Sequence, residues 1–270
     1  MLIKANNQIK LTGRVQYDSQ IKKFTEYLQG KEFSEITLRE YFQSMKENDL
    51  SPSTQRLAKV ALKKAIRQAL PAGYEVDEKL NSVFKSIKLD KPQVRVSGDK
   101  VIDKKLLLKF LNNSPERISL ISKFLYNSGC RISEALSVKL SQCKADGKAV
   151  YIKIIGKGGK QETLTVSLDL FEKIKTVFKS EKYLFQSPLS KSGKYHRVYV
   201  SGEIAFYSHK LTGKRISAHD LRHSRATHLI GEGNPIEAVS KFLRHSDIGT
   251  TLRIYSHNIL TTKTILSSGV

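Results

Sequence analysis

A stretch without any periodic pattern divides the chain and constrains its fold more than any other feature. It covers residues 88–100, KLDKPQVRVSGDK, which are mostly polar and cationic and include a proline and a glycine. This composition is typical of a linker. Because 270 residues can form two ordinary domains, each with a core of its own, we predict a domain over 1–90, a linker over 91–100 and a second domain over 101–270.

The first domain is predicted to be helical, because apolar residues recur there at helical spacing. The expected helices cover 18–29, 34–48, 51–70 and 76–87. The third expected helix has no acidic residue, and four of its cations are three or four positions apart: Arg56, Lys59, Lys63 and Arg67. This basic stripe suits a helix that lies along or in a DNA groove. An ordinary solvated helix face would show the same pattern.

Charge and cysteine content narrow the class of protein. The formal net charge is +22, from 47 Lys and Arg against 25 Asp and Glu, and the excess is spread through the chain. Such basicity indicates a polyanionic partner, most often nucleic acid, although some soluble proteins are merely basic. The two cysteines form no CxxC pair or zinc-spaced cluster, which favours a reducing cytosol and no structural metal. Neither a membrane span nor the apolar core of a signal peptide is present, so we expect a cytoplasmic, nucleoid-associated protein.

The second domain is predicted to be mainly α with a small antiparallel sheet. Helical patterns cover 102–111, 115–127, 168–178 and 198–211, and others begin at 131 and 219. The sheet signal is a hairpin whose strands are 150–155 and 163–166, with a second short strand expected at 183–185. The turn between the hairpin strands carries Lys157 and Lys160. These lysines suit contact with a nucleic-acid backbone, but lysines in a turn also serve solubility alone.

Five short motifs follow one another along this domain. They are Arg131-Ile-Ser-Glu-Ala-Leu, Gly-Lys157-Gly, His219-x-x-Arg222, His245-Ser-Asp and Thr-Thr-x-x-x-Tyr255. Each is weak alone; a His-x-x-Arg pair, for example, shares one helix face for many structural reasons. Together the motifs supply cations that can hold a phosphodiester and a phenol that can attack it.

This ordered set resembles the tyrosine recombinase, or phage integrase, family of site-specific DNA recombinases, and is Xer-like in its organisation. The resemblance covers nearly the whole chain, and its strongest part is SAHDLRHSRATHLI followed by LRHSDIGTTLRIYSH. It implies an N-terminal helical core-binding (SAM-like) domain and a mixed α/β catalytic domain. It also implies cleavage and rejoining of DNA through a 3′-phosphotyrosyl intermediate, for integration, excision or resolution of DNA.

The resemblance assigns the covalent step to three residues. Tyr255 is the expected nucleophile, and the bond that it forms with the phosphate conserves the energy of the phosphodiester, so no ATP is needed. Arg131 and Arg222 are the expected pair that grips the non-bridging oxygens, since guanidinium groups match phosphate geometry and stay charged. With these cations we expect no metal and no cofactor.

Further residues follow from the same resemblance. Lys157 corresponds to the general acid that protonates the leaving 5′-oxygen, and His219 and His245 correspond to histidines that assist by hydrogen bonding and proton transfer. Lys160 has no assigned family role and is interpreted as a DNA contact. Arg244 is a departure, because the family usually has glycine immediately before the second histidine.

The expected partner is double-stranded DNA with paired recombination sites, bound by a homotetramer with or without accessory proteins, and no membrane. A type IB topoisomerase uses related chemistry, but the helical first domain and the short chain favour a recombinase. The alternative from another class is a catalytically inactive DNA-binding or architectural protein of the same fold. A complete set of Arg131, Lys157, Arg222 and Tyr255 argues against that alternative. Mobile-element and chromosomal roles both stay open.

Overall fold

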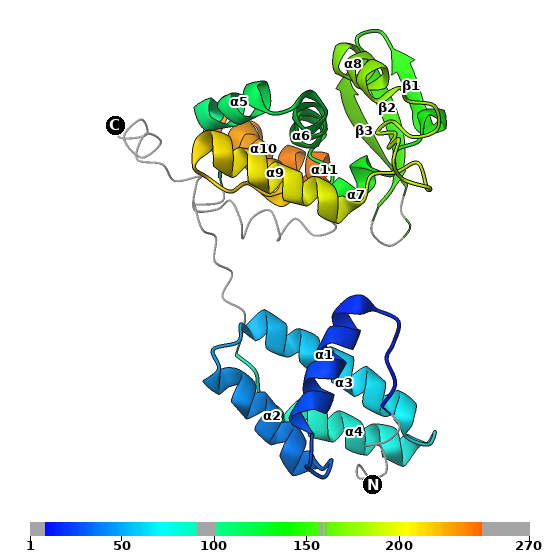
Figure 1. Cartoon of the computed structure of the whole chain (residues 1–270), viewed down its shortest axis with the longest axis vertical. Helices are drawn as coiled ribbons and strands as arrows, with labels where there is room; N and C mark the ends of the chain where they lie inside the picture. Colours follow the sequence, from blue (N-terminus) through cyan, green and yellow to red (C-terminus); the bar gives the residue numbers. More distant parts are fainter. Residues whose placement is uncertain (1–8, 91–100, 157–158, 160, 245–270) are drawn as a thin grey trace. The chain divides into compact units, whose positions relative to one another are not determined.

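The computed structural model describes residues 9–90, 101–156, 159 and 161–244 (Figure 1). The chain separates into two compact units, Met1–Arg95 and Val96–Val270. Each unit has its own cluster of buried apolar side chains. The architecture is mainly helical with one small antiparallel sheet, which confirms the predicted fold class.

The described part of the first unit consists of four helices. They are α1 (Val15–Tyr27), α2 (Glu35–Glu47), α3 (Pro52–Ala69) and α4 (Tyr74–Ser86). Two of them begin at side-chain caps: the hydroxyls of Ser34 and Ser51 accept hydrogen bonds from the third residue of α2 and α3. Helix α3 lies against both α1 and α4. Its buried side chains, Leu62 and Ile66 among them, join Phe24 and Phe42 in the core of this unit.

The second unit is built around the helix α6 (Glu116–Ser128), in which eight of 13 residues are buried. The other helical elements of this unit are α5 (Lys104–Asn113), α7 (Ile132–Ala135), the 3-10 turn η3 (Leu140–Gln142), α8 (Leu168–Phe178), α9 (Arg197–Thr212), α10 (Ala218–Gly231) and α11 (Ile236–Leu243). Figure 1 shows α6 with the sheet and α8 on one side and α5, α9 and α10 on the other, and α6 contacts elements of both groups. Its apolar side chains face the core, whereas Glu116 and Asn127 at its two ends are exposed.

The sheet has three antiparallel strands in the order β1 (Cys143–Asp146), β2 (Ala149–Ile155), β3 (Gln161–Ser167). Strand β2 alternates buried and exposed residues, so one face of the sheet joins the core. In the register of the hairpin, Ile152 lies opposite Leu164 and Ile155 opposite Gln161. The predicted hairpin is therefore present, and its strands lead directly into and out of the segment with Lys157 and Lys160.

The strands differ from the sequence expectations in two places. Residues 183–185 do not form a strand; Tyr183 makes only an isolated bridge to Lys139, and Phe185 fills the core edge-on to Phe124 and Phe178. A short apolar run can serve either as a strand or as a buried turn, and its length does not distinguish them. Strand β1 was not expected, because it has only four residues, two of which are charged; none of the four is buried.

Candidate active site

The site is organised around the turn that ends α6. Gly129 closes this helix in the left-handed conformation, at a φ of 57°, which glycine adopts without steric cost. A Cβ at this position would lie 2.8 Å from Cε1 of Phe242 on α11, so the close approach of the two helices also requires glycine. Cys130 is fully buried, and burial raises its thiol pKa to about 11, which makes it a packing residue.

Arg131 follows this turn and begins α7. Its side chain stays 40% exposed, while Glu134, one helical turn later, is almost buried. The Glu134 carboxylate accepts hydrogen bonds from the Arg131 backbone N–H at 2.8 Å and from Nη1 of its guanidinium at 2.7 Å. One carboxylate thus holds both the backbone N–H and the guanidinium of Arg131. Within the part of the chain that the structure describes, the remaining guanidinium N–H groups have no hydrogen-bond partner and can bind an anion.

Arg222 reaches the same turn from α10 and is almost completely buried. Nη1 donates to the carbonyl of Gly129 at 2.6 Å, and Nη2 donates to the carbonyl of Leu243 at 2.6 Å. These carbonyls belong to the C-terminal ends of α6 and α11, where a cation is stabilised by the helix dipoles. Burial, and then the nearby charges of Arg131 and Arg244, lower the pKa of Arg222 to about 10, so it remains charged at neutral pH.

His219 lies one turn before Arg222 on the same helix. Its side chain is exposed, and its ring meets that of His223 edge-on at 4.4 Å between ring centroids. Helix α10 begins at Ser217, whose hydroxyl accepts from the Asp220 backbone N–H at 3.2 Å. The Ser217 cap therefore fixes where α10 begins, and with it the positions of His219 and Arg222 in the first turns of the helix.

Arg244 lies at the end of α11 in the left-handed conformation, with φ of 58° and ψ of 44°. This backbone explains why glycine is usual at the position in the family, since an L-residue is strained there. Its guanidinium turns back into the site, donating to the carbonyl of Phe242 at 2.9 Å and to that of Gly129 at 3.3 Å. Arg131, Arg222 and Arg244 are called the arginine cluster below.

The described residues bring together three of the expected features: Arg131, Arg222 and, one turn away on α10, His219. Lys157, Lys160, His245 and Tyr255 lie outside the described residues. Sequence reasoning gave no role to Glu134 or Glu162, although both contact the arginine cluster. The i, i+3 spacing of Arg131 and Glu134 is a local signal for the first contact, whereas no local signal indicates the second.

The basic stripe of α3 has partners within its own unit. Lys59 Nζ donates to the carbonyl of Ile87 at 2.7 Å and Arg56 Nη2 to that of Asp90 at 3.1 Å, just after the end of α4. Arg67 forms an ion pair with Asp77. Burial, and then Lys63 and Arg56, lower the pKa of Lys59. The stripe therefore helps to fasten α4 onto α3, and its contact with DNA stays a prediction.

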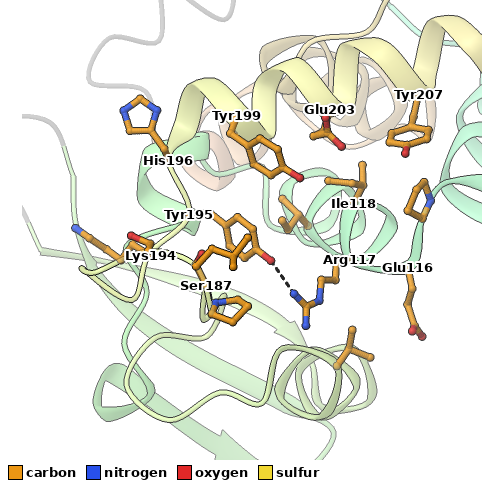
Figure 2. Close-up of a pocket in the computed structure, with 16 residues that line it drawn as sticks. Glu116, Arg117, Ile118, Ser187, Lys194, Tyr195, His196, Tyr199, Glu203 and Tyr207 are labelled. Atoms are coloured by element: carbon orange, nitrogen blue, oxygen red, sulfur yellow. Dashed lines mark hydrogen bonds between the residues drawn. The ribbon is translucent and has the colours of Figure 1, made fainter.

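A cavity of about 870 Å³ lies elsewhere in the second unit, between the start of α6, the residues before α9 and α9 itself (Figure 2). Tyr195 accepts a hydrogen bond from Arg117 at 3.1 Å and stacks on Tyr199 with 6.1 Å between ring centroids. Arg131, His219 and Arg222, the predicted catalytic residues that the structure describes, do not line this cavity. Tyr195 and Tyr199 line it at the start of α9, and the arginine cluster lies outside its lining.

Two kinds of group are absent from the described residues. Within the described ranges, no three or more His, Cys, Asp or Glu side chains gather so that they could hold a metal ion. No helix in those ranges has both the length and the apolar content that crossing a membrane requires.

Comparison with protein families gives one clear match. The model of the phage integrase family matches residues 100–260, more than half of the chain. Among curated relatives, the tyrosine recombinase XerC of Psychromonas ingrahamii is 33% identical over 207 residues, which are 72% of this chain and 67% of the relative. The tyrosine recombinase XerD of Caulobacter vibrioides is 29% identical over 236 residues, 82% of this chain and 76% of the relative.

A probable integrase/recombinase protein of Methanocaldococcus jannaschii is 33% identical over 155 residues, and this chain spans only 46% of its length. Among solved structures, the XerH site-specific recombinase in a post-cleavage complex with its difH substrate superposes with a TM-score of 0.66 at 20% identity. That match covers 94% of this chain and 78% of XerH. A lambda integrase dimer bound to a core site gives 0.67 at 18% identity, with 90% and 91% covered. At these identities the structures support the fold alone.

Proposed function

This chain belongs to the phage integrase family and is a tyrosine-type site-specific DNA recombinase, and we propose that it acts through a 3′-phosphotyrosyl intermediate at Tyr255. Enzymes of this family cleave and rejoin DNA. The observation that carries the residue assignment is the arginine cluster at Gly129. Two arginines from elements far apart in the sequence, α7 and α10, are fixed at one turn, each by two hydrogen bonds.

In the proposed reaction, the phenolic oxygen of Tyr255 attacks the scissile phosphorus while the bond from phosphorus to the 5′-oxygen breaks. Lys157 gives a proton to that leaving oxygen, and the phenol proton passes to a nearby base, for which His219 and His245 are the candidates. A free 5′-hydroxyl and a phosphotyrosyl ester result. Attack by the 5′-hydroxyl of a partner strand reverses the step and rejoins the DNA without an external energy source.

Two members of the arginine cluster, Arg131 and Arg222, supply the positive field for this step. A free tyrosine has a pKa of about 10 and is mostly protonated at neutral pH, so attack requires both a base and stabilisation of the charge on phosphorus. Arg131 and Arg222 together hold N–H donors that are not used by the protein contacts described above. Because these contacts hold the two guanidinium groups before DNA arrives, little reorganisation is needed during the reaction.

The assembly that we propose is a homotetramer on two paired sites, which exchanges strands two at a time, either alone or with accessory proteins. The basic stripe of α3 (Arg56, Lys59, Lys63, Arg67) and Lys160 are proposed to contact the DNA backbone. Acting on DNA places the protein at the nucleoid in the cytoplasm. Integration or excision of a mobile element is one role consistent with this activity, and resolution of joined DNA molecules is another.

The test uses trapped cleavage. A binding site is first selected from a pool of random duplexes, and a nick is then placed beside the cleavage point so that a short fragment is lost after attack. We expect the wild-type chain to form a protein–DNA adduct that survives a denaturing gel. The variant Tyr255→Phe should bind the same duplex with unchanged affinity and form no adduct, since it lacks only the attacking oxygen. Adduct formed by this variant would refute Tyr255 as nucleophile, and none from the wild type would favour the inactive DNA-binding alternative.

A further inference from the structure

Arg244 connects the arginine cluster to β3, the strand that follows Lys157 and Lys160 in the chain. Its side chain is only 8% exposed. Nε lies 3.2 Å from Oε2 of Glu162, the second residue of β3, and Nη2 lies 3.7 Å from Oε2 of Glu134. Among the described residues neither the Nε nor the Glu162 oxygen has an aligned hydrogen bond, so charge rather than geometry holds this pair. A single guanidinium thus spans α7, α11 and β3.

Glu162 in turn lies against the opposite strand of the hairpin. A Cβ on Gly156 would meet the Glu162 carboxylate carbon at 3.1 Å and both of its oxygens at 3.2 Å. A side chain at position 156 would therefore press on the carboxylate and force it to shift. Gly156 directly precedes Lys157 in the chain, and Glu162 is bonded to Gln161, which pairs with Ile155. The Glu162 carboxylate that Arg244 attracts is thus part of β3 and lies against Gly156, the residue that follows β2. It therefore joins the two strand ends that flank the segment containing Lys157 and Lys160 in the chain.

The position of Arg244 is unfavourable for stability. It combines a left-handed backbone with a buried charge, and burial is the largest cause of its lowered pKa. A buried ion pair seldom adds net stability, because desolvation offsets the attraction between the charges. Glycine would remove both unfavourable contributions. An arginine at this site is therefore better explained by a task in the reaction than by folding.

We propose that Arg244 is a positioning residue, which holds the hairpin through Glu162 so that Lys157 is placed to protonate the leaving 5′-oxygen. The inference rests on the proposed function and adds to it a link, through Glu162, between the arginine cluster and the hairpin whose strands flank Lys157 in the chain. In this scheme Arg244 need not touch the phosphate. It acts on the bond that breaks, through the lysine, rather than on the bond that Tyr255 forms.

The variant Arg244→Gly tests the proposal, because glycine accepts the left-handed backbone and threatens the fold least. We measure single-turnover cleavage of the nicked duplex with two leaving groups, the normal 5′-oxygen and a 5′-bridging sulfur. A thiol has a pKa of about 8.5, far below that of an alcohol, so a thiolate leaves without a general acid. With oxygen, Arg244→Gly should cleave about 10- to 100-fold more slowly than wild type, part of the gain that general acid catalysis gives. With sulfur, its rate relative to wild type should return to near one.

Two control variants calibrate the result. Lys157→Ala should lose more activity than Arg244→Gly on the oxygen substrate and recover equally on sulfur, whereas Arg222→Ala should stay slow on both. Glu162→Gln removes the charge that Arg244 attracts and should reproduce the behaviour of Arg244→Gly. Equal slowing of Arg244→Gly on both substrates, or no slowing on oxygen, would overturn the proposal. Because wild-type cleavage is measured in the same assay, failure of the proposed function itself would appear separately, as no cleavage by the wild type.

Discussion

The two groups of cations in this protein use the same local device in different surroundings. In the basic stripe, Arg56 and Lys59 donate to carbonyls at or just beyond the C-terminal end of α4. In the arginine cluster, Arg222 and Arg244 donate to carbonyls at the ends of α6 and α11. Helix C-termini carry unsatisfied carbonyls and partial negative charge, which explains why cations collect there in both units.

Burial separates the two groups. Arg56 is exposed and Lys59 half-buried, whereas Arg222 is 3% exposed and Arg244 is enclosed between two carboxylates. An exposed cation is screened by salt and can shift to meet a phosphate. A buried guanidinium keeps its geometry and stays charged at a cost in desolvation. The stripe is thus suited to affinity for DNA and the cluster to the chemistry of one phosphate.

The largest expected effect is that of Arg222→Ala. It removes a preorganised donor from the transition state, and loss of one such donor costs about 10²- to 10³-fold in rate. It also leaves the carbonyls of Gly129 and Leu243 without this partner, at about 1.5–3 kcal/mol for each hydrogen bond to a charged group. Single-turnover cleavage and urea unfolding measure the two losses. Arg222→Lys is the control: it keeps the charge, but one ammonium group cannot replace the two-pronged contact, so most of the rate should still be lost.

A smaller effect is expected from Gly129→Ala, which alters the turn rather than a cation. The new methyl group would clash with Phe242 and add left-handed strain, so we expect a loss of about 1–3 kcal/mol in the free energy of unfolding. Gly147→Ala is a matched control, because Gly147 has nearly the same φ, 56°, and no atom lies within 4 Å of the position that its new methyl group would take. The difference between the two variants isolates the contact with α11. Equal losses would mean that backbone strain alone limits this turn.

The smallest expected effect concerns the basic stripe. Replacing Lys63 and Arg56 with alanine should weaken DNA binding without abolishing cleavage at saturating protein. If each contacts one phosphate, the slope of log affinity against log salt should fall by about 0.9 per residue. Binding measured over a series of salt concentrations gives this slope. An unchanged slope would mean that the stripe serves only to hold α4, in which case the double variant should instead lower the unfolding free energy.

Local pattern was enough to predict much of this protein. Most helices of both units and the hairpin follow from apolar residues at a spacing of three to four or of two. The arginines and Tyr255 were found as motifs, because each is marked by its immediate neighbours in the chain. Strand β1 and the residues 183–185 were not predicted correctly, since a four-residue strand with two charged residues and a buried apolar turn lack a distinctive local pattern.

The sequence by itself determined which chemistry-bearing residues are present and on which elements Arg131, His219 and Arg222 lie. Only the tertiary structure decided what holds them. The turn at Gly129, Glu162 on β3, Arg222 on α10 and Arg244 after α11 are separated by tens of residues, yet they meet through hydrogen bonds and an ion pair. Such contacts depend on how the helices pack around α6. They cannot be predicted from neighbouring residues in the sequence, because the whole core determines this packing.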